Sequence, residues 1–195
     1  MDHNPADLIA TKQALRTTAR AARTAMSPHE RAAASAALCE RLLTLHEFRR
    51  VRTVLLYAST GDEVDLAAAV TGLRERDVRT LFPRVHRDQL QLVNVTDLRN
   101  LQLGHRGIRE PTGATVDPGV VDVAVVPGVA FDPHGGRLGQ GGGHYDRLLP
   151  ALASRARRVG VGFSCQMVPE VPREPHDVAL DLVVTERAVY RTSAA

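Results

Sequence analysis

The sequence of 195 residues contains only two cysteines and one lysine, and it has no long apolar run. Two cysteines, Cys39 and Cys165, cannot build a disulfide framework, so a reducing cytoplasm is the expected location. No apolar stretch is long enough to span a bilayer, so no membrane association is expected. Residues 1–10 include two aspartates and a proline where a signal peptide needs a basic and then an apolar stretch. We therefore expect a cytoplasmic protein without a secretory signal.

The scarcity of lysine leaves arginine as almost the whole basic component, with a formal net charge of +3. Abundant arginine is explained either by a codon bias or by recognition of phosphates and carboxylates, which suit the guanidinium fork. A nucleic-acid binder would gather its arginines on one element, but here they are spread from Arg16 to Arg191. We therefore favour the codon bias for most of the arginines and expect no nucleic-acid partner.

Hydrophobic periodicity divides the chain into helices and strands that alternate. Helices are expected over residues 6–25, 27–45, 65–73 and 143–154, the second beginning with a capping box at Ser27 and Glu30. Strands are expected over residues 53–57, 78–82, 121–126, 158–163 and 182–185. Pro83 is expected to stop the second strand, and a hairpin over residues 85–95 is expected to turn at Arg87 and Asp88.

This alternation predicts one α/β domain over residues 1–195, since the length suffices for one compact core and hardly for two. Strands that alternate with helices favour a mostly parallel sheet covered on both faces, in a three-layer α/β/α arrangement. In such sheets ligands bind at the carboxyl ends of the strands.

A glycine-rich segment carries the strongest chemical signal. Val-Pro-Gly-Val-Ala-Phe-Asp at residues 126–132 is followed by Arg-Leu-Gly-Gln-Gly-Gly-Gly-His-Tyr-Asp at residues 137–146. Glycines let the backbone approach a ligand and turn its N–H groups toward it, and a helix start adds partial positive charge. Arg137 and Arg147 can reach phosphate oxygens, and Asp146 is a hard oxygen ligand for magnesium. The segment therefore favours phosphate binding over a flexible turn without a ligand, although it matches neither the P-loop nor the dinucleotide fingerprint.

The segment resembles that of the 5-formyltetrahydrofolate cyclo-ligase family, also called 5,10-methenyltetrahydrofolate synthetase. The resemblance extends along nearly the whole chain through short pieces in the same order. These pieces are residues 12–16, Tyr57 with residues 63–65, residues 81–85, 108–111, 160–163 with Gln166, and 172–186. The sequence departs from the usual family pattern at Leu66, Gly142 and His144.

The resemblance implies the fold of sugar-phosphate isomerases and CoA transferases, and an ATP-dependent reaction. That reaction converts 5-formyltetrahydrofolate to 5,10-methenyltetrahydrofolate with release of ADP and phosphate. ATP would phosphorylate the formyl oxygen, and N10 would then close the ring. The protein would mainly position two ligands and neutralise phosphate charge with Mg²⁺. A monomer or weak homodimer is expected.

Roles implied by the resemblance fall on residues scattered over the chain. Arg137 and Tyr145 would be catalytic, and Asp146 and Asp177 would bind magnesium. The residues implied for ATP are Lys12, Gln13, Ala14, Leu15, Arg16, Arg137, Leu138, Gly139, Gln140, Gly141, Gly142, Gly143, His144 and Tyr145. Those implied for the folate are Ala58, Glu63, Gln140, Gly141, Gly142, Gly143 and His144.

Each of these roles has a plainer alternative. Lys12 and Arg16 lie one helical turn apart, so both could point at one triphosphate or simply form a solvated helix face. Glu63 could bind the donor edge of a pterin or be a solvated loop acid, and Asp177 could equally be a turn residue. For the whole chain, the alternatives are a non-catalytic relative and a sugar-phosphate isomerase or transferase. Loss of Lys12, Arg137 or Asp146 would mark the first, and ADP release with a folate would exclude the second.

Overall fold

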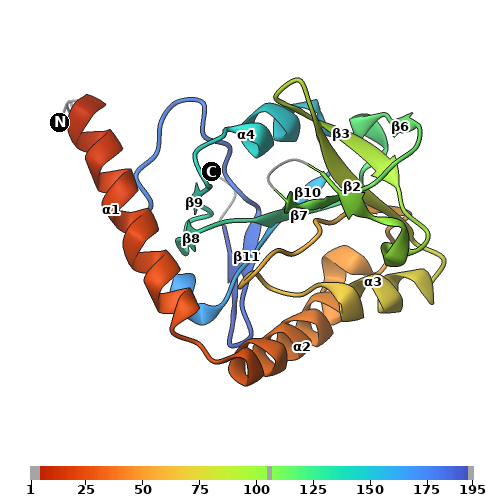
Figure 1. The fold of residues 1–195 in the computed structure, drawn as a ribbon, viewed down its shortest axis with the longest axis horizontal. Coiled ribbons are helices and arrows are strands. Elements are labelled where there is room, and N and C mark those ends of the chain that lie inside the picture. The colour runs from red at the N-terminus through yellow and green to blue at the C-terminus, as the bar shows by residue number, and fades with distance from the viewer. Residues whose placement is uncertain (1–4, 105–106, 193–195) are drawn as a thin grey trace.

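A computed structural model describes residues 5–104 and 107–192, and its centre is an eight-stranded sheet (Figure 1). The strand order is β12-β11-β10-β7-β1-β2-β3-β6. The five strands from β11 to β2 are parallel to one another, and β12, β3 and β6 pair in antiparallel fashion. Residues 1–4 lie outside the described residues, so part of the stretch compared above with a signal peptide is not described. The two ends of the domain predicted over residues 1–195 also lie outside the described residues. No helix in the described part of the chain has the length and apolar character needed to cross a bilayer.

The strands of the central sheet are short and mostly apolar. They are β1 (Thr53–Leu55), β2 (Arg79–His86), β3 (Gln89–Asn94), β6 (Thr115–Val116), β7 (Val123–Pro127), β10 (Arg157–Val161), β11 (Leu182–Val184) and β12 (Val189–Arg191). Two small antiparallel pairs stand apart from this sheet. They are β4 (Gln102–Leu103) with β5 (Arg109–Glu110), and β8 (Ala130–Phe131) with β9 (Arg137–Leu138).

Helices cover both faces of the sheet, so the predicted α/β fold with a mostly parallel sheet is confirmed. Helices α2 (Pro28–Thr44) and α3 (Ala67–Arg74) pack together on one face, where Leu38, Leu42 and Val70 join a large apolar cluster (Figure 1). The short α4 (His144–Leu148) and the 3-10 turn after it cover the other face through Leu148, Leu149 and Leu152. Each β strand of the centre is buried on both sides, which explains its nearly continuous apolar sequence.

Helix α1 (Pro5–Thr24) lies at one end of the molecule and has its own small core (Figure 1). Leu15 and Ala19 pack against Val129, Leu138 and Val171, which belong to the β8–β9 hairpin and the segment after the 3-10 turn Ser164–Gln166. The same helix also contacts that 3-10 turn, which follows the carboxyl end of β10. Helix α1 therefore borders the edge of the sheet where a ligand site is expected.

Two local predictions from the sequence are wrong at the level of single elements, and one strand was missed. Pro83 does not stop β2, because β1 ends at Leu55 opposite Leu81 and no neighbouring strand needs an N–H at Pro83. The helix predicted over residues 143–154 ends at Leu148, since Pro150 cannot continue it. Strand β12 was not predicted, because three residues at a sheet edge are too few to show a pattern.

Other local predictions are confirmed. The β2–β3 hairpin turns at Arg87 and Asp88, whose φ angles of 47° and 62° are those of a type I′ turn. The capping box at the start of α2 is present, with Ser27 and Glu30 bonded reciprocally. Leu66, where the family pattern usually has threonine, precedes α3 without a side-chain cap and is buried in the core. Leu66 therefore contributes apolar packing at the start of α3, while the Asp65 side chain accepts from the backbone N–H of Ala67 at 2.9 Å.

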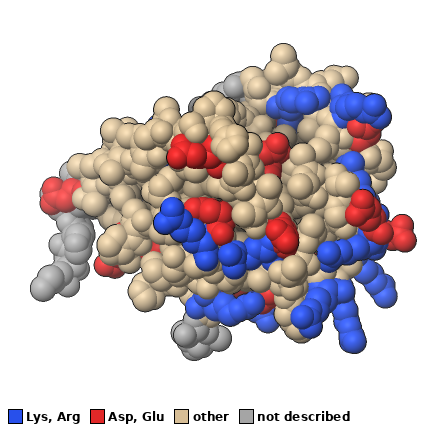
Figure 2. Space-filling view, turned by 90° about the horizontal axis from the view of Figure 1, so that it is seen from below, with Lys and Arg blue, Asp and Glu red and all other residues tan. Residues whose placement is uncertain are grey.

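Arginines that are scattered in the sequence come together in the fold. Arg52 precedes β1, Arg79 begins β2 and Arg157 begins β10, so they share the amino edge of the parallel strands. Figure 2, which views the molecule from the side of α2 and α3, shows basic side chains gathered over its lower and right-hand parts. A cavity of about 640 Å³ at this edge is lined by Arg157, Arg158 and other residues, none of them among those predicted to bind ATP, folate or magnesium. The predicted residues gather around the glycine-rich segment instead, and the candidate site is described there.

Candidate functional site at the carboxyl edge of the sheet

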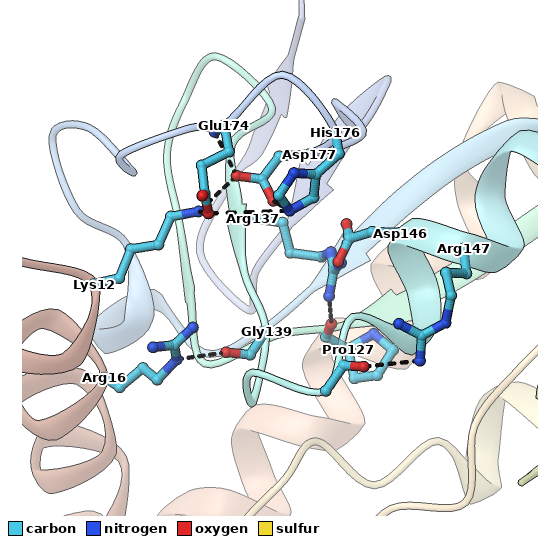
Figure 3. A network of polar contacts seen from close by, with 11 residues as sticks. Lys12, Arg16, Pro127, Arg137, Gly139, Asp146, Arg147, Glu174, His176 and Asp177 are labelled. Atoms are coloured by element: carbon cyan, nitrogen blue, oxygen red, sulfur yellow. Dashed lines mark hydrogen bonds and ion pairs between the residues drawn. The ribbon is translucent and has the colours of Figure 1, made fainter. Parts of the chain in front are cut away.

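Lys12 reaches from α1 to a loop that lies far away in the sequence (Figure 3). Its Nζ is 2.7 Å from Oε2 of Glu174 and 2.7 Å from Oδ2 of Asp177, and the lysine is only 7% exposed. Burial lowers the pKa of Lys12, but the hydrogen bonds to the two carboxylates outweigh it and hold the pKa above its usual value. Burial likewise opposes ionisation of Asp177, yet Lys12 keeps the pKa of that carboxyl below its usual value. The single lysine is therefore a charged, fixed group and not part of a solvated helix face.

The glycine-rich segment is held from both sides by arginines. On the α1 side, Arg16 Nε donates to the carbonyl of Gly139 at 3.0 Å, and Arg20 donates to the side chain of Gln140. On the other side, Arg147 donates to the carbonyl of Gly142 at 2.9 Å. The same nitrogen donates to the Asp88 carbonyl in the β2–β3 turn at 2.7 Å. Figure 3 shows Arg16 and Arg147 on opposite sides of the segment. The segment is therefore anchored through its carbonyl groups, which leaves its N–H groups available to a ligand.

Arg137, Asp146 and Tyr145 form a compact group at the end of this segment. Arg137 is paired with Asp146 at 2.7 Å and also donates to the carbonyl of Pro127, the last residue of β7, at 3.4 Å. Its guanidinium carbon lies 5.7 Å from the centroid of the Tyr145 ring, within cation–π range. Burial raises the pKa of the Tyr145 phenol, so this hydroxyl stays protonated and can donate a hydrogen bond.

Glu63 lies in the loop that follows β1, close enough to α4 for its charge to act on Tyr145. Its Oε2 accepts from the backbone and hydroxyl of Thr60, both at 3.1 Å. Burial raises the pKa of Glu63, and its charge in turn contributes to the raised pKa values of Tyr57 and Tyr145. Glu63 is thus a partly buried carboxylate beside the glycine-rich segment rather than a solvated loop acid.

The structure brings most of the predicted residues together but separates some from the rest. Gln13 and Ala14 lie on the exposed side of α1, whereas Leu15 and Leu138 are packed in the small core between α1 and the β8–β9 hairpin. Ala58 is half-buried against the main core at the end of β1. His144 is half-buried at the first position of α4. Polar contacts from the predicted set therefore come chiefly from Lys12, Arg16, Glu63, Arg137 and the glycine-rich segment.

The two aspartates predicted to bind magnesium have different surroundings. Asp177 belongs to a cluster with Glu174 and His176, whose candidate ligand atoms all lie within 4.8 Å of one another. Asp146 is not part of that cluster: its Oδ1 accepts from Arg137, and its Oδ2 has no hydrogen bond among the described residues. Carboxylate oxygens are the ligands that magnesium prefers, so the free Oδ2 of Asp146 is compatible with that ion.

Several residues of this site were not predicted. Glu174 and His176 join Asp177 and Lys12, and Arg23 and Asp62 form an ion pair next to Glu63. Arg23 lies on the same side of α1 as Lys12, Arg16 and Ala19, at spacings of about one helical turn, and this periodicity was the available signal. Glu174 had no local signal, because its role depends on contact with a residue 162 positions earlier.

Comparison with known proteins places this sequence among relatives of one kind. The model of the 5-formyltetrahydrofolate cyclo-ligase family matches residues 8–186. The chain is 30% identical to the 5-formyltetrahydrofolate cyclo-ligase of Escherichia coli strain K12, covering 86% of this chain and 96% of that one. It is 33% identical to the enzyme of that name from Mycolicibacterium smegmatis, over 70% of this chain and 74% of the other.

Solved structures show the same relationship. The NMR structure of Aquifex aeolicus 5,10-methenyltetrahydrofolate synthetase is similar with a TM-score of 0.83 and 36% identity, covering 94% of each chain. A 5,10-methenyltetrahydrofolate synthetase from Mycoplasma pneumoniae is similar with a TM-score of 0.76 and 25% identity, covering 90% of this chain and 98% of that one. The family model covers most of the chain, and the similar enzymes and structures bear the same name, so the chain belongs to the 5-formyltetrahydrofolate cyclo-ligase family.

Proposed function

We propose that this protein converts 5-formyltetrahydrofolate and ATP to 5,10-methenyltetrahydrofolate, ADP and phosphate. The observation that carries the proposal is the meeting of two chemically different groups at one edge of the sheet. Arg137 lies in the glycine-rich segment, and Arg16 and Lys12 of α1 contact that segment and the loop of residues 174–177. The Glu63 carboxyl lies in the loop after β1 and interacts electrostatically with Tyr145 of the same region. Cations suit a triphosphate, and a partly buried carboxylate suits the N–H donors of a pterin ring.

The proposed reaction asks the protein for position and charge neutralisation. The formyl oxygen attacks the γ-phosphorus, ADP leaves, and N10 then attacks the activated carbon and loses its proton as phosphate departs. Arg137 would stabilise the transferring phosphoryl group, and its pairing with Asp146 and the Tyr145 ring restricts its orientation beforehand. Protonated Tyr145 would donate a hydrogen bond next to it. Lys12 and Arg16 would bind the remaining phosphate oxygens.

Magnesium is part of the proposal. Asp146 would hold the ion through its free oxygen, and Asp177 would contribute from the cluster with Glu174 and His176. A divalent ion bound with ATP would neutralise charge on the β- and γ-phosphates. Asp177 would first have to share or exchange its contact with Lys12, which is a hydrogen bond of 2.7 Å. We also propose a cytoplasmic location, which suits the free thiols of Cys39 and Cys165.

Absorbance of the methenyl product tests the function directly. Purified protein is expected to form 5,10-methenyltetrahydrofolate only when ATP and magnesium are both supplied, with one ADP released per product. A sugar-phosphate isomerase would need no ATP and would release no ADP with a folate. A non-catalytic relative would bind the ligands without forming product. Absence of product at saturating ATP, magnesium and substrate would overturn the proposal.

A further inference from the structure

Arg23 and Asp62 form a buried ion pair that neither the sequence pattern nor the reaction accounts for. Arg23 lies in the last turn of α1, and its side chain is only 7% exposed. Its guanidinium is 2.7 Å from Oδ1 of Asp62, while the hydroxyl of Thr24 donates to Oδ2 at 3.0 Å. Two successive residues of α1 therefore hold both oxygens of one carboxylate in the loop after β1.

That carboxylate stands directly beside Glu63. Within the loop, Glu63 is bonded only to Thr60: its backbone N–H donates to the Thr60 carbonyl at 3.0 Å, and its Oε2 accepts the two bonds already described. Its Oε1 has no hydrogen bond among the described residues, so it is the atom available to a ligand. The turn formed by residues 60–63 is small, and Asp62 is its link to α1. Movement of Asp62 would therefore move Glu63.

We propose that the Arg23–Asp62 pair positions Glu63 for the folate, so that α1 supports both ligand sites at once. The amino-terminal half of the helix holds the ATP side through Lys12 and Arg16, and its last turn holds the folate side through Arg23 and Thr24. Arg23 is thus a positioning residue and not a catalytic one. This inference rests on the proposed function, because it assigns Glu63 to the folate.

The charges of Arg23 and Asp62 also act directly on the pKa of Glu63, independently of the hydrogen bonds that hold the loop. The charged and titratable groups that act on Glu63 or respond to it come from each element packed there: Arg23 of α1, Asp62 of its own loop, Tyr57 after β1 and Tyr145 of α4. Burial raises the pKa of Glu63 most, Arg23 lowers it and Asp62 raises it. Arg23 and Asp62 therefore have opposite electrostatic effects on the pKa of Glu63. Loss of either residue breaks the same ion pair and so releases the loop in the same way.

This opposition allows a sharp test with two variants, Arg23→Met and Asp62→Asn. Both break the pair, so both are expected to raise the KM for 5-formyltetrahydrofolate about tenfold, the scale of one charge-assisted hydrogen bond, with the KM for ATP little changed. Folate binding needs ionised Glu63, so binding weakens at low pH. The acidic limb of kcat/KM for folate is expected to move to higher pH in Arg23→Met and to lower pH in Asp62→Asn.

Control variants separate positioning from general stability. Arg41→Met removes another partly buried arginine, one on α2 that donates to the Glu186 carbonyl at 3.1 Å away from the folate loop. It is expected to change stability without moving the folate KM or the pH profile. Thr24→Val removes only the weaker bond to Asp62 and is expected to raise the folate KM by a smaller factor, should Arg23→Met fail to fold.

The outcomes distinguish this inference from the proposed function. Hydrogen exchange of the amides of residues 60–64 in the ligand-free protein is expected to rise in both pair variants, whether or not the parent protein is active. A parent protein without methenyl product overturns the function, and unchanged exchange in both variants overturns the positioning of the loop. An active parent whose variants keep the parent's folate KM, or shift the pH limb in the same direction, overturns the inference and leaves the function standing.

Discussion

At the scale of single residues, Arg137 combines three contacts that no shorter or differently shaped side chain reproduces. Its pairing with Asp146, its bond to the Pro127 carbonyl and its position over the Tyr145 ring use the planar guanidinium. Arg137→Ala is expected to lower kcat/KM for ATP by about 100-fold, which corresponds to roughly 3 kcal/mol of lost transition-state stabilisation. Arg137→Lys is expected to recover only part of that loss. A folded Arg137→Ala variant with full activity at limiting ATP would show that this arginine is only structural.

Glu63 illustrates a conflict between stability and function at one side chain. Burial raises its pKa, so its protonated form is favoured in the folded state, and the stability this provides is lost as pH rises through the raised pKa. Glu63→Gln is therefore expected to raise the thermal midpoint at neutral pH, and this gain should disappear below the ordinary pKa of 4.5. The folate KM should rise about tenfold because the charged acceptor is gone. Thermal unfolding from pH 4 to 8 and folate kinetics check both parts; a variant with parental folate kinetics would contradict the binding role.

Replacement of Asp146 or Asp177 by asparagine is expected to impair the use of magnesium to different degrees. Asp146→Asn removes the oxygen proposed for magnesium and also weakens the ion pair with Arg137, so it should lower turnover and raise the magnesium needed for half activity. Asp177→Asn should have a smaller effect of the same kind, since Glu174 and His176 remain in its cluster. Magnesium titrations of each variant at fixed ATP provide the measurement. Curves that overlay the parent's would remove both aspartates from the metal site.

At the scale of elements, the glycine-rich segment depends on a backbone conformation that side chains disfavour. Gly141 has a φ angle of 102°, and a Cβ there would meet no atom closer than 3.8 Å, so strain and not collision opposes a side chain. Gly141→Ala is expected to cost about 1 kcal/mol of stability and, by shifting the N–H groups, to raise the KM for ATP severalfold. Gly107→Ala is the matched control, because its φ angle is 75° and the space around it is open. Equal ATP kinetics in the two variants would argue against phosphate binding by this backbone.

Helix α1 is the other element on which the site depends. Its inward face carries Lys12, Arg16 and Arg23, each bonded to a different loop, while Leu15 and Ala19 pack into the small core between them. Polar contacts and apolar packing thus alternate along one helix face. The same helix face therefore binds the loops of the site and packs against the β8–β9 hairpin.

At the scale of the whole molecule, the sheet offers little surface for pairing with a second copy. Its edge strands β12 and β6 have only three and two residues. Among the described residues the exposed large apolar side chains are Ile9, Leu103 and Val120, which lie on three separate segments. We therefore expect a monomer of 21.1 kDa at micromolar concentration by sedimentation equilibrium, with specific activity independent of protein concentration. A stable dimer would show that another surface, not these edges, mediates association.

Local patterns in the sequence determined the elements and the identity of the family. The capping box at Ser27, the alternation of apolar runs and the turn at Arg87 and Asp88 each act over a few residues, so the sequence alone reveals them. The glycine-rich segment is equally local, and its resemblance to the family pattern was confirmed by the matches. The two proline predictions failed for different reasons: Pro150 itself cannot continue α4, whereas Pro83 is tolerated in β2 because β1 ends opposite Leu81.

Only the tertiary structure decided which charges meet. Lys12 is bonded to Asp177 across 165 positions, and Arg16 to Gly139 across 123, distances over which no sequence pattern operates. Arg23 and Asp62 were assigned no role from the sequence, and arginines scattered along the chain share the amino edge of the sheet. Parallel strands bring their carboxyl ends to one edge whatever their order in the chain, and α1 then crosses that edge. The sequence therefore determined the groups available for chemistry, and the folding of parallel strands beside α1 determined their partners.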